Sequence, residues 1–399
     1  MTSNNRPSKP QKHADTRLTT AGRDPNANFG IVNPPVYHAS TVTFPTLAAM
    51  NEADKHKFDQ TYYGRYGTPT TFAFEAAVAD LEGAAHGIAL PSGMAAIAVA
   101  IIANVQAGDH VLITDNAYHP THKLAQGILK SFGVEASYYD PMCGAGIKDH
   151  IRPNTKIVFT EAPGSITFEV QDIPAISEAA HKAGALVLMD NTWSAGYHFK
   201  PFEHGVDISI QAATKYIVGH SDAMLGTLTM NDRALWEGAK LTASSLGHST
   251  SPDDCYLGMR GLRSLAARLP RHEATALKLA HWLSDQPEIE TVLHPALPHC
   301  PGHDIWKRDF TGSSGLFGVV LKEGPDSAAI ARMLDGMELF AMGYSWGGFE
   351  SLIIPANPGA TRTTYDWPYK GQTLRLHAGL EDPDDLIHDL ADGLKRLAL

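Results

Sequence analysis

Lys215 and Asp190 are the two residues whose types and positions point most directly to chemistry. Lys215 lies in ATKYIVGHSD, at the end of an apolar segment that we predict to be a buried strand. Burial disfavours the charged form of an amine, so it lowers the pKa and leaves a nucleophile that attacks carbonyl carbon. Most lysines lie on protein surfaces, and this local pattern alone leaves that interpretation open.

Asp190 closes another apolar segment, ALVLMD. A carboxylate at the end of a buried strand is costly unless it faces a cation. The protonated nitrogen of a pyridine ring is such a cation, and holding that proton keeps the ring an electron sink for a substrate carbanion. Asp190 and Asn191 are also good helix N-caps, so capping remains the alternative for this position.

An anion site is indicated by PSGM, residues 91–94, which follows a predicted strand and opens the apolar helix AAIAVAIIANV. Free backbone N–H groups at a helix N-terminus bind phosphate well. Tyr63 and Arg65, in YYGRYG, add a phenol and a fixed cation that suit the same ligand. An ordinary strand-to-helix turn and a solvated arginine are the alternatives.

Tyr118 and Arg375 complete the candidate set. Tyr118 follows a predicted strand in DNAYHPT, where its ring could stack on a cofactor and its hydroxyl could relay a proton. Arg375 lies inside the apolar, strand-like TLRLHAG, where a guanidinium favours a planar anion such as an amino acid carboxylate. A packed loop tyrosine and an internal ion pair are the respective alternatives.

Composition limits the classes of partner. With 43% hydrophobic and 19% charged residues, the 399-residue chain is typical of a globular protein of two or three domains. Its formal net charge of -11 provides no positive field for nucleic acid or an anionic membrane surface. A small-molecule substrate is therefore expected.

Cysteine usage and the N-terminal residues predict a soluble, cytoplasmic protein. The chain has 3 cysteines, an odd number without C-x-x-C spacing, so neither a disulfide framework nor a zinc cage is indicated. The first twenty residues are polar and unlike a signal peptide, and no segment approaches the ~20 apolar residues of a membrane span. Gly144-Ala145-Gly146 lacks the third glycine of a dinucleotide-binding motif.

Apolar segments alternate with helical patterns along the middle of the chain. Predicted strands precede Pro91, Asp115, Glu161, Asp190 and Lys215, and helices are expected over 121–133 and 173–184. This order is typical of a parallel sheet covered by helices on both faces. In such sheets ligands bind at the carboxyl ends of the strands, where these polar residues lie.

The C-terminal part has a different pattern. Residues 260–285 predict a long helix that Pro270 should kink or divide. Strands over 315–321 and 373–379 and helices over 326–337 and 384–399 then predict a smaller α+β domain. A Pro- and Gly-rich surface loop is expected over 354–372, and residues 1 to about 66 are expected to be an arm lying on other elements.

Taken together, the segments YYGRYGTPT, LPSGMAAI, DNAYHPT, MDNTWS, ATKYIVGHSD, TGSSGLF, YSWGGFES and LRLHAGLED resemble the Cys/Met-metabolism family of enzymes that use pyridoxal 5'-phosphate (PLP). The resemblance extends from about His13 to the C-terminus. It implies an α/β, aspartate-aminotransferase-like large domain (PLP fold type I) with a mostly parallel sheet. The implied domains are an arm of residues 1–66 that contacts a neighbouring subunit, a PLP-binding domain over 67–261 and an α+β domain over 262–399.

The resemblance also implies residue roles. Lys215 would hold PLP as a Schiff base, with Asp190 on the pyridine nitrogen and Tyr118 stacked on the ring. Gly93, Met94 and Thr214 would bind the phosphate, and Tyr63 and Arg65 would reach the phosphate of a neighbouring subunit. Arg375, Ser345, Trp346 and Tyr63 would bind the substrate. A site that is shared between two subunits implies a dimer as the smallest active unit. The usual assembly of the family implies a tetramer built as a dimer of dimers.

Within the family, the chain most resembles the bacterial β-lyases that cleave cystathionine. Ala212 replaces the serine of the S-x-T-K motif found in many γ-acting relatives, and Gly164-Ser165-Ile166 replaces their Asn-Pro. The implied reaction is β-elimination to homocysteine, pyruvate and ammonia, with Lys215 taking the Cα proton and Lys215 or Tyr118 protonating the sulfur. Cysteine or cystine cleavage, a γ-acting enzyme and a non-catalytic regulator on this fold are the alternatives.

Overall fold

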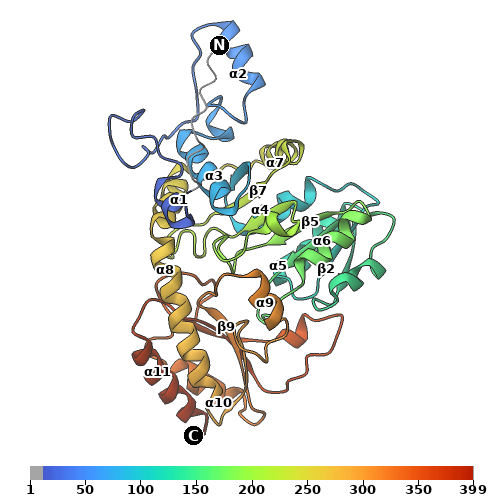
Figure 1. The fold of residues 1–399 in the computed structure, drawn as a ribbon, viewed down its shortest axis with the longest axis vertical. Helices are drawn as coiled ribbons and strands as arrows, with labels where there is room; N and C mark the ends of the chain where they lie inside the picture. Colours follow the sequence, from blue (N-terminus) through green and yellow to red (C-terminus); the bar gives the residue numbers. More distant parts are fainter. Residues whose placement is uncertain (1–11, 399) are drawn as a thin grey trace, which may run out of the picture.

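A seven-stranded mixed sheet forms the centre of the large domain in the computed structural model, which describes residues 12–398 (Figure 1). Its strand order is β1-β7-β6-β5-β4-β2-β3. Strands β2 to β6 pair in parallel, whereas β7 is antiparallel to both of its neighbours. The bounds are β1 His86–Leu90, β2 His110–Thr114, β3 Glu135–Tyr139, β4 Thr155–Glu161, β5 Leu186–Asp190, β6 Ile208–Gln211 and β7 Gly226–Met230.

Helices cover both faces of this sheet, as the apolar strand segments predict. Val111 and Ile113 of β2 pack on one face with helices α4 and α7, while Leu112 packs on the other face with α6. Successive side chains of a strand point to opposite faces, so a strand buried on both sides has no polar alternation. The helices are α3 Pro69–Glu82, α4 Gly93–Ile102, α5 His119–Leu124, α6 Ile173–Lys182 and α7 Arg233–Ser245, with a π-helical turn at Ala125–Leu129.

The smaller domain is built on a four-stranded antiparallel sheet of order β10-β11-β9-β8. Phe317, Val319 and Leu321 of its strand β9 belong to an apolar cluster that includes the helices beside it. The expected α+β architecture is therefore confirmed. The elements are β8 Ile289–Leu293, α9 His303–Asp309, β9 Leu316–Leu321, α10 Ser327–Asp335, β10 Leu352–Ala356, β11 Thr373–His377 and α11 Pro383–Lys395.

Helix α8, Pro252–Ser284, runs along both domains without a break (Figure 1). Pro270 lies inside it, so of the two expected effects of this proline, division of the helix is wrong and a kink stays a prediction. A proline removes one backbone hydrogen bond. The side chains on either side of it, Leu269 and His272, are nevertheless buried, so tertiary packing holds the helix together. The expected domain boundary at residues 261 and 262 lies within this helix.

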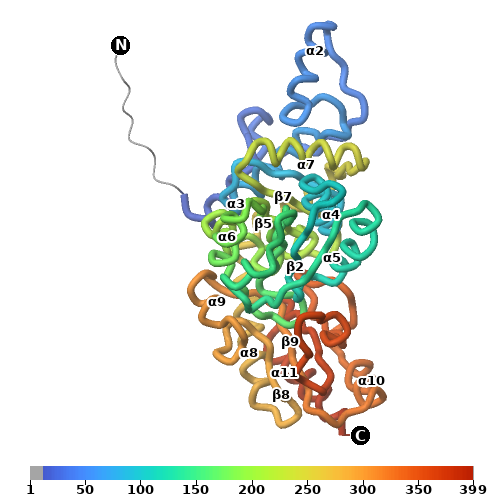
Figure 2. Tube along the Cα trace, turned by 90° about the vertical axis from the view of Figure 1, so that its right-hand side faces the viewer, coloured from blue at the N-terminus to red at the C-terminus, as the bar shows by residue number. Residues whose placement is uncertain are grey.

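The N-terminal segment begins with α1, Ala14–Thr20, whose Leu18 is buried against α3 and α8. Helix α2, Leu47–Lys55, has no buried residue and projects away from the rest of the chain in both views (Figures 1 and 2). Residues 1–11 of the predicted arm lie outside the described part. Within that part, no helix is long and apolar enough to cross a bilayer.

Two local features complete the comparison with the sequence. The three cysteines, Cys143, Cys255 and Cys300, are free thiols, two of them buried. Gly144-Ala145-Gly146 lies in a 3-10 helix, Gly144–Asp149, and not at the start of an α-helix. The structure therefore gives the dinucleotide-binding alternative no support.

Candidate active site

Lys215 lies in the turn that follows β6, four residues beyond its last residue, Gln211. Its Nζ donates to Oγ of Ser345 over 2.6 Å and lies 5.3 Å from the centre of the Trp346 ring. Burial, and secondarily the charge of Arg375, lowers the pKa of Lys215 to about 8. The amine therefore releases its proton near neutral pH, as a nucleophilic or basic lysine must.

Asp190 is the last residue of β5 and is buried. Its Oδ1 accepts from the amide and the hydroxyl of Thr192, over 3.0 and 2.5 Å. Burial raises the pKa of Asp190, while the hydrogen bonds from Thr192 and the charge of Lys215 oppose that shift. Residues 191–197 form turns and no helix, so the helix-capping alternative for Asp190 is wrong.

Thr192 is a residue to which the sequence analysis gave no role. Its hydroxyl donates to Asp190 and accepts from the amide of Ala212 over 2.9 Å. It therefore joins the end of β5 to the turn that carries Lys215. The quoted MDNTWS segment contains this threonine, but no spacing rule connects it with Ala212, which lies 20 residues further along the chain.

Tyr118 is 46% exposed and lies just after β2, at the N-terminus of α5. Its amide donates to Oε2 of Glu161 over 2.7 Å. Burial, followed by the charges of Asp190 and Glu161, raises the pKa of its phenol. Glu161 ends β4 directly beside Asp190 in the parallel register, and its own pKa is raised well above the ordinary value by burial. Glu161 thus fixes the Tyr118 backbone, a role that its strand-end position alone does not reveal.

Arg375 extends from β11 of the smaller domain towards the same cluster. Its Nη2 donates to the carbonyl oxygens of Ser345 and Gly343, over 2.9 and 3.4 Å. Burial lowers the pKa of Arg375 to about 10, and no carboxylate among residues 12–398 forms an ion pair with it. The internal ion pair considered from the sequence is absent, so the guanidinium is available for a substrate carboxylate.

The segment 345–347 is packed closely on Lys215. Ser345 has a φ of 82°, a left-handed conformation that L-residues adopt at a cost. Gly347 has a φ of 87°, and a Cβ at this position would lie 2.9 Å from the carbonyl carbon of Lys215. The ring of Trp346 lies 5.4 Å from that of Tyr216. This tight fit places Ser345 and Trp346 next to the amine.

The turn before α4 is built for close approach. Ser92 caps the helix by accepting from the amide of Ala95 over 3.1 Å. A Cβ on Gly93 would lie 2.5 Å from the Cβ of Ala212, so only glycine fits beside the Lys215 turn. Within residues 12–398 no partner accepts from the amides of Gly93 and Met94. Two free N–H groups at this helix N-terminus suit a phosphate.

Thr214 is engaged with the chain itself. Its hydroxyl donates to the carbonyl oxygen of Leu225 over 3.1 Å and accepts from the Leu225 amide over 2.8 Å. These two bonds tie the turn before Lys215 to the residue preceding β7. One lone pair of the hydroxyl oxygen is left for a further donor. The implied phosphate contact stays a prediction for this residue.

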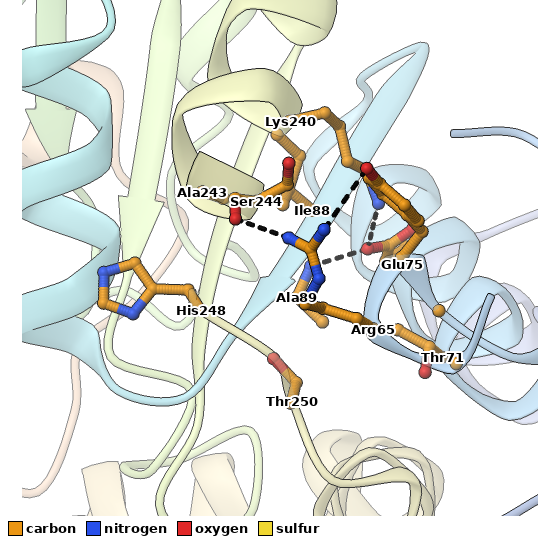
Figure 3. A pocket seen from close by; sticks show the side chains of 13 residues that line it. Arg65, Thr71, Glu75, Ile88, Ala89, Lys240, Ala243, Ser244, His248 and Thr250 are labelled. Atoms are coloured by element: carbon orange, nitrogen blue, oxygen red, sulfur yellow. Dashed lines mark hydrogen bonds and ion pairs between the residues drawn. The ribbon is translucent and has the colours of Figure 1, made fainter. Parts of the chain in front are cut away.

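Arg65 lies in a pocket that is separate from the Lys215 cluster. Figure 3 shows Arg65 in a pocket at the end of α7, where its Nη1 donates to the carbonyl oxygen of Ser244 over 2.6 Å. The lining of this pocket contains the buried ion pair of Lys240 and Glu75, with 2.6 Å between Nζ and Oε1, and no residue of the Lys215 site. Tyr63 is 41% exposed.

Comparison with known proteins identifies the family. Residues 15–395 match the family described as Cys/Met metabolism PLP-dependent enzyme. The chain belongs to this family. PLP, the family's cofactor, is therefore the group that the Lys215 site must accommodate.

Individual relatives are similar over nearly their whole lengths. The chain is 46% identical to cystathionine beta-lyase MetC of Escherichia coli over 97% of this chain and 99% of the relative. It is 49% identical to a putative cystathionine beta-lyase of Rhizobium johnstonii over 95% of each. The crystal structure of metB from Corynebacterium glutamicum superposes with a TM-score of 0.87 at 30% identity, covering 97% of this chain and 99% of that one. The predicted PLP fold type I is confirmed.

The residues present fit PLP. Lys215, with its lowered pKa, suits the PLP aldehyde. The buried Asp190 carboxylate, which has no hydrogen-bonded cation, suits the ring nitrogen. The free amides at the N-terminus of α4 suit the phosphate. The carboxylate of Asp190 is within electrostatic reach of both Lys215 and Tyr118.

Proposed function

We propose that the chain is a carbon–sulfur lyase that cleaves L-cystathionine by β-elimination, releasing homocysteine, pyruvate and ammonia. The observation that carries this proposal is that the Lys215 amine and the free guanidinium of Arg375 both bind Ser345, and so lie at one site. The near full-length similarity to proteins named cystathionine beta-lyase supports the choice of substrate.

Lys215 is proposed to move the proton at Cα of the substrate. Its pKa of about 8 leaves a substantial fraction of the amine neutral at physiological pH, so it can accept a proton and return it. Bound PLP supplies the electron sink that makes Cα acidic. Ser345 orients the amine through the 2.6 Å hydrogen bond, and Trp346 forms one wall beside it.

Asp190 is proposed to hold the proton on the pyridine nitrogen, and Tyr118 to cover the ring face. The two residues follow strands of the same sheet edge, and Asp190 raises the pKa of the Tyr118 phenol through its charge. A phenol kept protonated is a donor for the departing sulfur, a role shared with Lys215. Gly93, Met94 and Thr214 are proposed to contact the phosphate.

Arg375 is proposed to bind the substrate carboxylate in a bidentate manner. Two carbonyl oxygens of the segment 343–345 already orient its Nη2, and no carboxylate among residues 12–398 forms an ion pair with the guanidinium. Ser345 is held in a left-handed conformation, and Gly347 packs tightly on Lys215. These contacts hold the Lys215 amine and the Arg375 guanidinium in fixed relative positions.

Assembly is proposed to complete the site. Arg65 lies in a pocket that contains no residue of the Lys215 cluster, and Tyr63 is 41% exposed, which fits contacts to the phosphate and substrate of a neighbouring subunit. The unburied α2 and the exposed Phe29 fit an arm that lies on a second copy. We therefore propose a dimer as the smallest active unit and a tetramer of two dimers, working in the cytoplasm.

Product analysis tests the proposal. Purified enzyme with PLP is incubated with cystathionine, cysteine and methionine in separate reactions, and the keto acids are identified. Pyruvate together with homocysteine from cystathionine is expected. 2-Oxobutyrate would instead establish a γ-acting enzyme, and a protein that binds no PLP and forms no keto acid would establish the regulator alternative. Lys215→Ala protein should form no pyruvate above the background.

A further inference from the structure

The loop between β10 and β11 is attached to the large domain through the carboxylate of Asp115. Asp115 follows β2 and is 1% exposed. It accepts from the amide of Thr363 over 2.9 and 3.0 Å and from its hydroxyl over 2.6 Å. Thr364 adds its amide over 3.0 Å and its hydroxyl over 2.9 Å. Among residues 12–398, the carboxylate thus receives donors only from this loop.

A second carboxylate holds the two ends of the same turn. Glu169, which is 4% exposed, accepts from Nη2 of Arg362 over 2.6 Å and from the Tyr365 hydroxyl over 2.5 Å. The Arg362 side chain is itself only 2% exposed. The turn 362–365, which we call the clamp turn, is therefore anchored at every residue. The sequence predicted a surface loop over 354–372. Thr363 and Thr364 are exposed, but their amides and hydroxyls bind the buried Asp115 carboxylate.

The clamp turn lies between two groups of the proposed active site. On one side, Asp115 is three residues before Tyr118, whose amide is fixed by Glu161. Asn116 keeps the intervening backbone in place, since its carbonyl oxygen accepts from the Ser165 amide over 2.9 Å. On the other side, the clamp turn leads into β11, which carries Arg375.

The charge distribution favours a role beyond simple attachment. Two buried carboxylates face the clamp turn, but only Glu169 has an ion-pair partner, Arg362. Burial acts to raise the pKa of Asp115, yet the hydrogen bonds from Thr363 and Thr364 outweigh it and hold the pKa below its ordinary value. The ionised form of Asp115 is stabilised by the donors of Thr363 and Thr364, and their hydrogen bonds require that carboxylate. These hydrogen bonds therefore form and break cooperatively.

We propose that Asp115 is a positioning residue that, through Thr363 and Thr364, fixes the distance between the Tyr118 ring and the Arg375 guanidinium. This inference rests on the roles proposed above for Tyr118 and Arg375. Tyr118 belongs to the large domain and Arg375 to the small one, so their separation is set by how the domains are joined on this side of the site. The clamp turn is the link that the structure provides there.

Hydrogen exchange on the cofactor-free chain tests the positioning directly. Thr363→Val with Thr364→Val removes both hydroxyl donors while the backbone amides remain. Thr361→Val is the matched control, because the Thr361 hydroxyl bonds only to the carbonyl oxygen of Pro358 in its own loop. We expect exchange in the peptide containing residues 115–118 to accelerate about 10-fold in the double variant and to stay unchanged in the control.

Kinetics of the PLP-loaded enzyme provides the second readout. The double variant and Asp115→Asn should each lower kcat/KM for cystathionine about 10-fold, mainly by raising KM. The reason is that Arg375, which binds the substrate carboxylate, and the Tyr118 ring are then no longer held at a fixed separation. Unchanged exchange over 115–118 would overturn the proposal, as would an unchanged kcat/KM in both variants. Amides of β4 and β5 report whether a variant is folded. Failure of the proposed reaction itself would appear separately, as absence of pyruvate from the parent enzyme.

Discussion

The Nζ of Lys215 and the Oγ of Ser345 lie 2.6 Å apart and come from different domains. Lys215 follows β6 of the large domain, while Ser345 precedes β10 of the small one. The amine is therefore enclosed only where the two domains meet, and this enclosure lowers its pKa. A buried amine is useful for catalysis and costly for stability, which leads to the first prediction.

Replacing Lys215 should stabilise the cofactor-free chain below about pH 8. The Lys215 pKa is about 8 in the folded chain, against a reference of 10.5, so between these values the unfolded chain holds a proton that the folded chain lacks. Stability of the parent therefore rises with pH across this window. Lys215→Met should be more stable by about 2 kcal/mol at pH 7, and the difference should vanish near pH 10.5. Denaturant unfolding at a series of pH values measures it.

Lys182→Met is the control for that series. Lys182 is an exposed lysine paired with Glu178 on α6, and removing it should change stability by less than about 0.5 kcal/mol at every pH. A Lys215→Met chain that is less stable than the parent at pH 7 would mean that burial does not destabilise the protonated Lys215 amine.

Asp190→Asn should lower kcat/KM for cystathionine by about 100-fold. The amide keeps the shape of the side chain but cannot hold a proton on a pyridine nitrogen. It also removes a charge that favours protonated Lys215, so the acidic limb of the pH–rate profile, where Lys215 must lose its proton, should move to lower pH. Steady-state kinetics as a function of pH measures both effects. Activity within threefold of the parent would contradict the assigned role of Asp190.

Gly93→Ala should weaken PLP binding by about 10-fold, because its Cβ would meet that of Ala212 at 2.5 Å and push the anion-binding turn away from Lys215. Fluorescence titration of the cofactor-free chain with PLP measures the affinity. Gly238→Ala, within α7, is the matched control, since nothing lies within 4 Å of its Cβ. The control should leave PLP affinity unchanged and stabilise the helix by about 0.5–1 kcal/mol. Equal affinities for both variants would refute the tight fit at Gly93.

Lys240→Met should destabilise the chain by about 3 kcal/mol, because it leaves the buried Glu75 carboxylate without its partner (Figure 3). Both side chains are 7% exposed, so water cannot replace the lost interaction. Adding Glu75→Gln to the variant removes the unpaired charge and should restore part of the loss. Thermal and denaturant unfolding compare the three proteins, and a loss below about 1 kcal/mol in the single variant would argue against an ionised pair.

The strands with continuous apolar segments were predictable, and those without them were not. Segments before Pro91, Asp115, Glu161 and Asp190 form β1, β2, β4 and β5 at the expected places. The edge strand β3 is partly exposed, and β7 is fully buried but contains Thr227 and Thr229, so neither is a continuous apolar segment. The strand before Lys215 ends at Gln211, because the chain must turn to place the amine.

Residues on strand ends were predictable as site candidates because parallel strands bring their carboxyl ends to one edge. Lys215, Asp190 and Tyr118 meet there as expected, and Arg375 joins them from the second sheet. Thr192 and the clamp turn were missed. Their contacts join residues 20 or more positions apart through single hydroxyl and amide groups, which leave no periodic trace in a sequence.

Borohydride reduction of the PLP-loaded enzyme, followed by peptide mapping, tests the central claim most directly. The reduced cofactor should be found on Lys215 alone. Lys200 is the internal comparison, because burial lowers its pKa to about 8 as well, yet its Nζ is bound to two carbonyl oxygens. A phosphopyridoxyl group on Lys200 or on any other lysine, with the Lys215 peptide unmodified, would contradict the account.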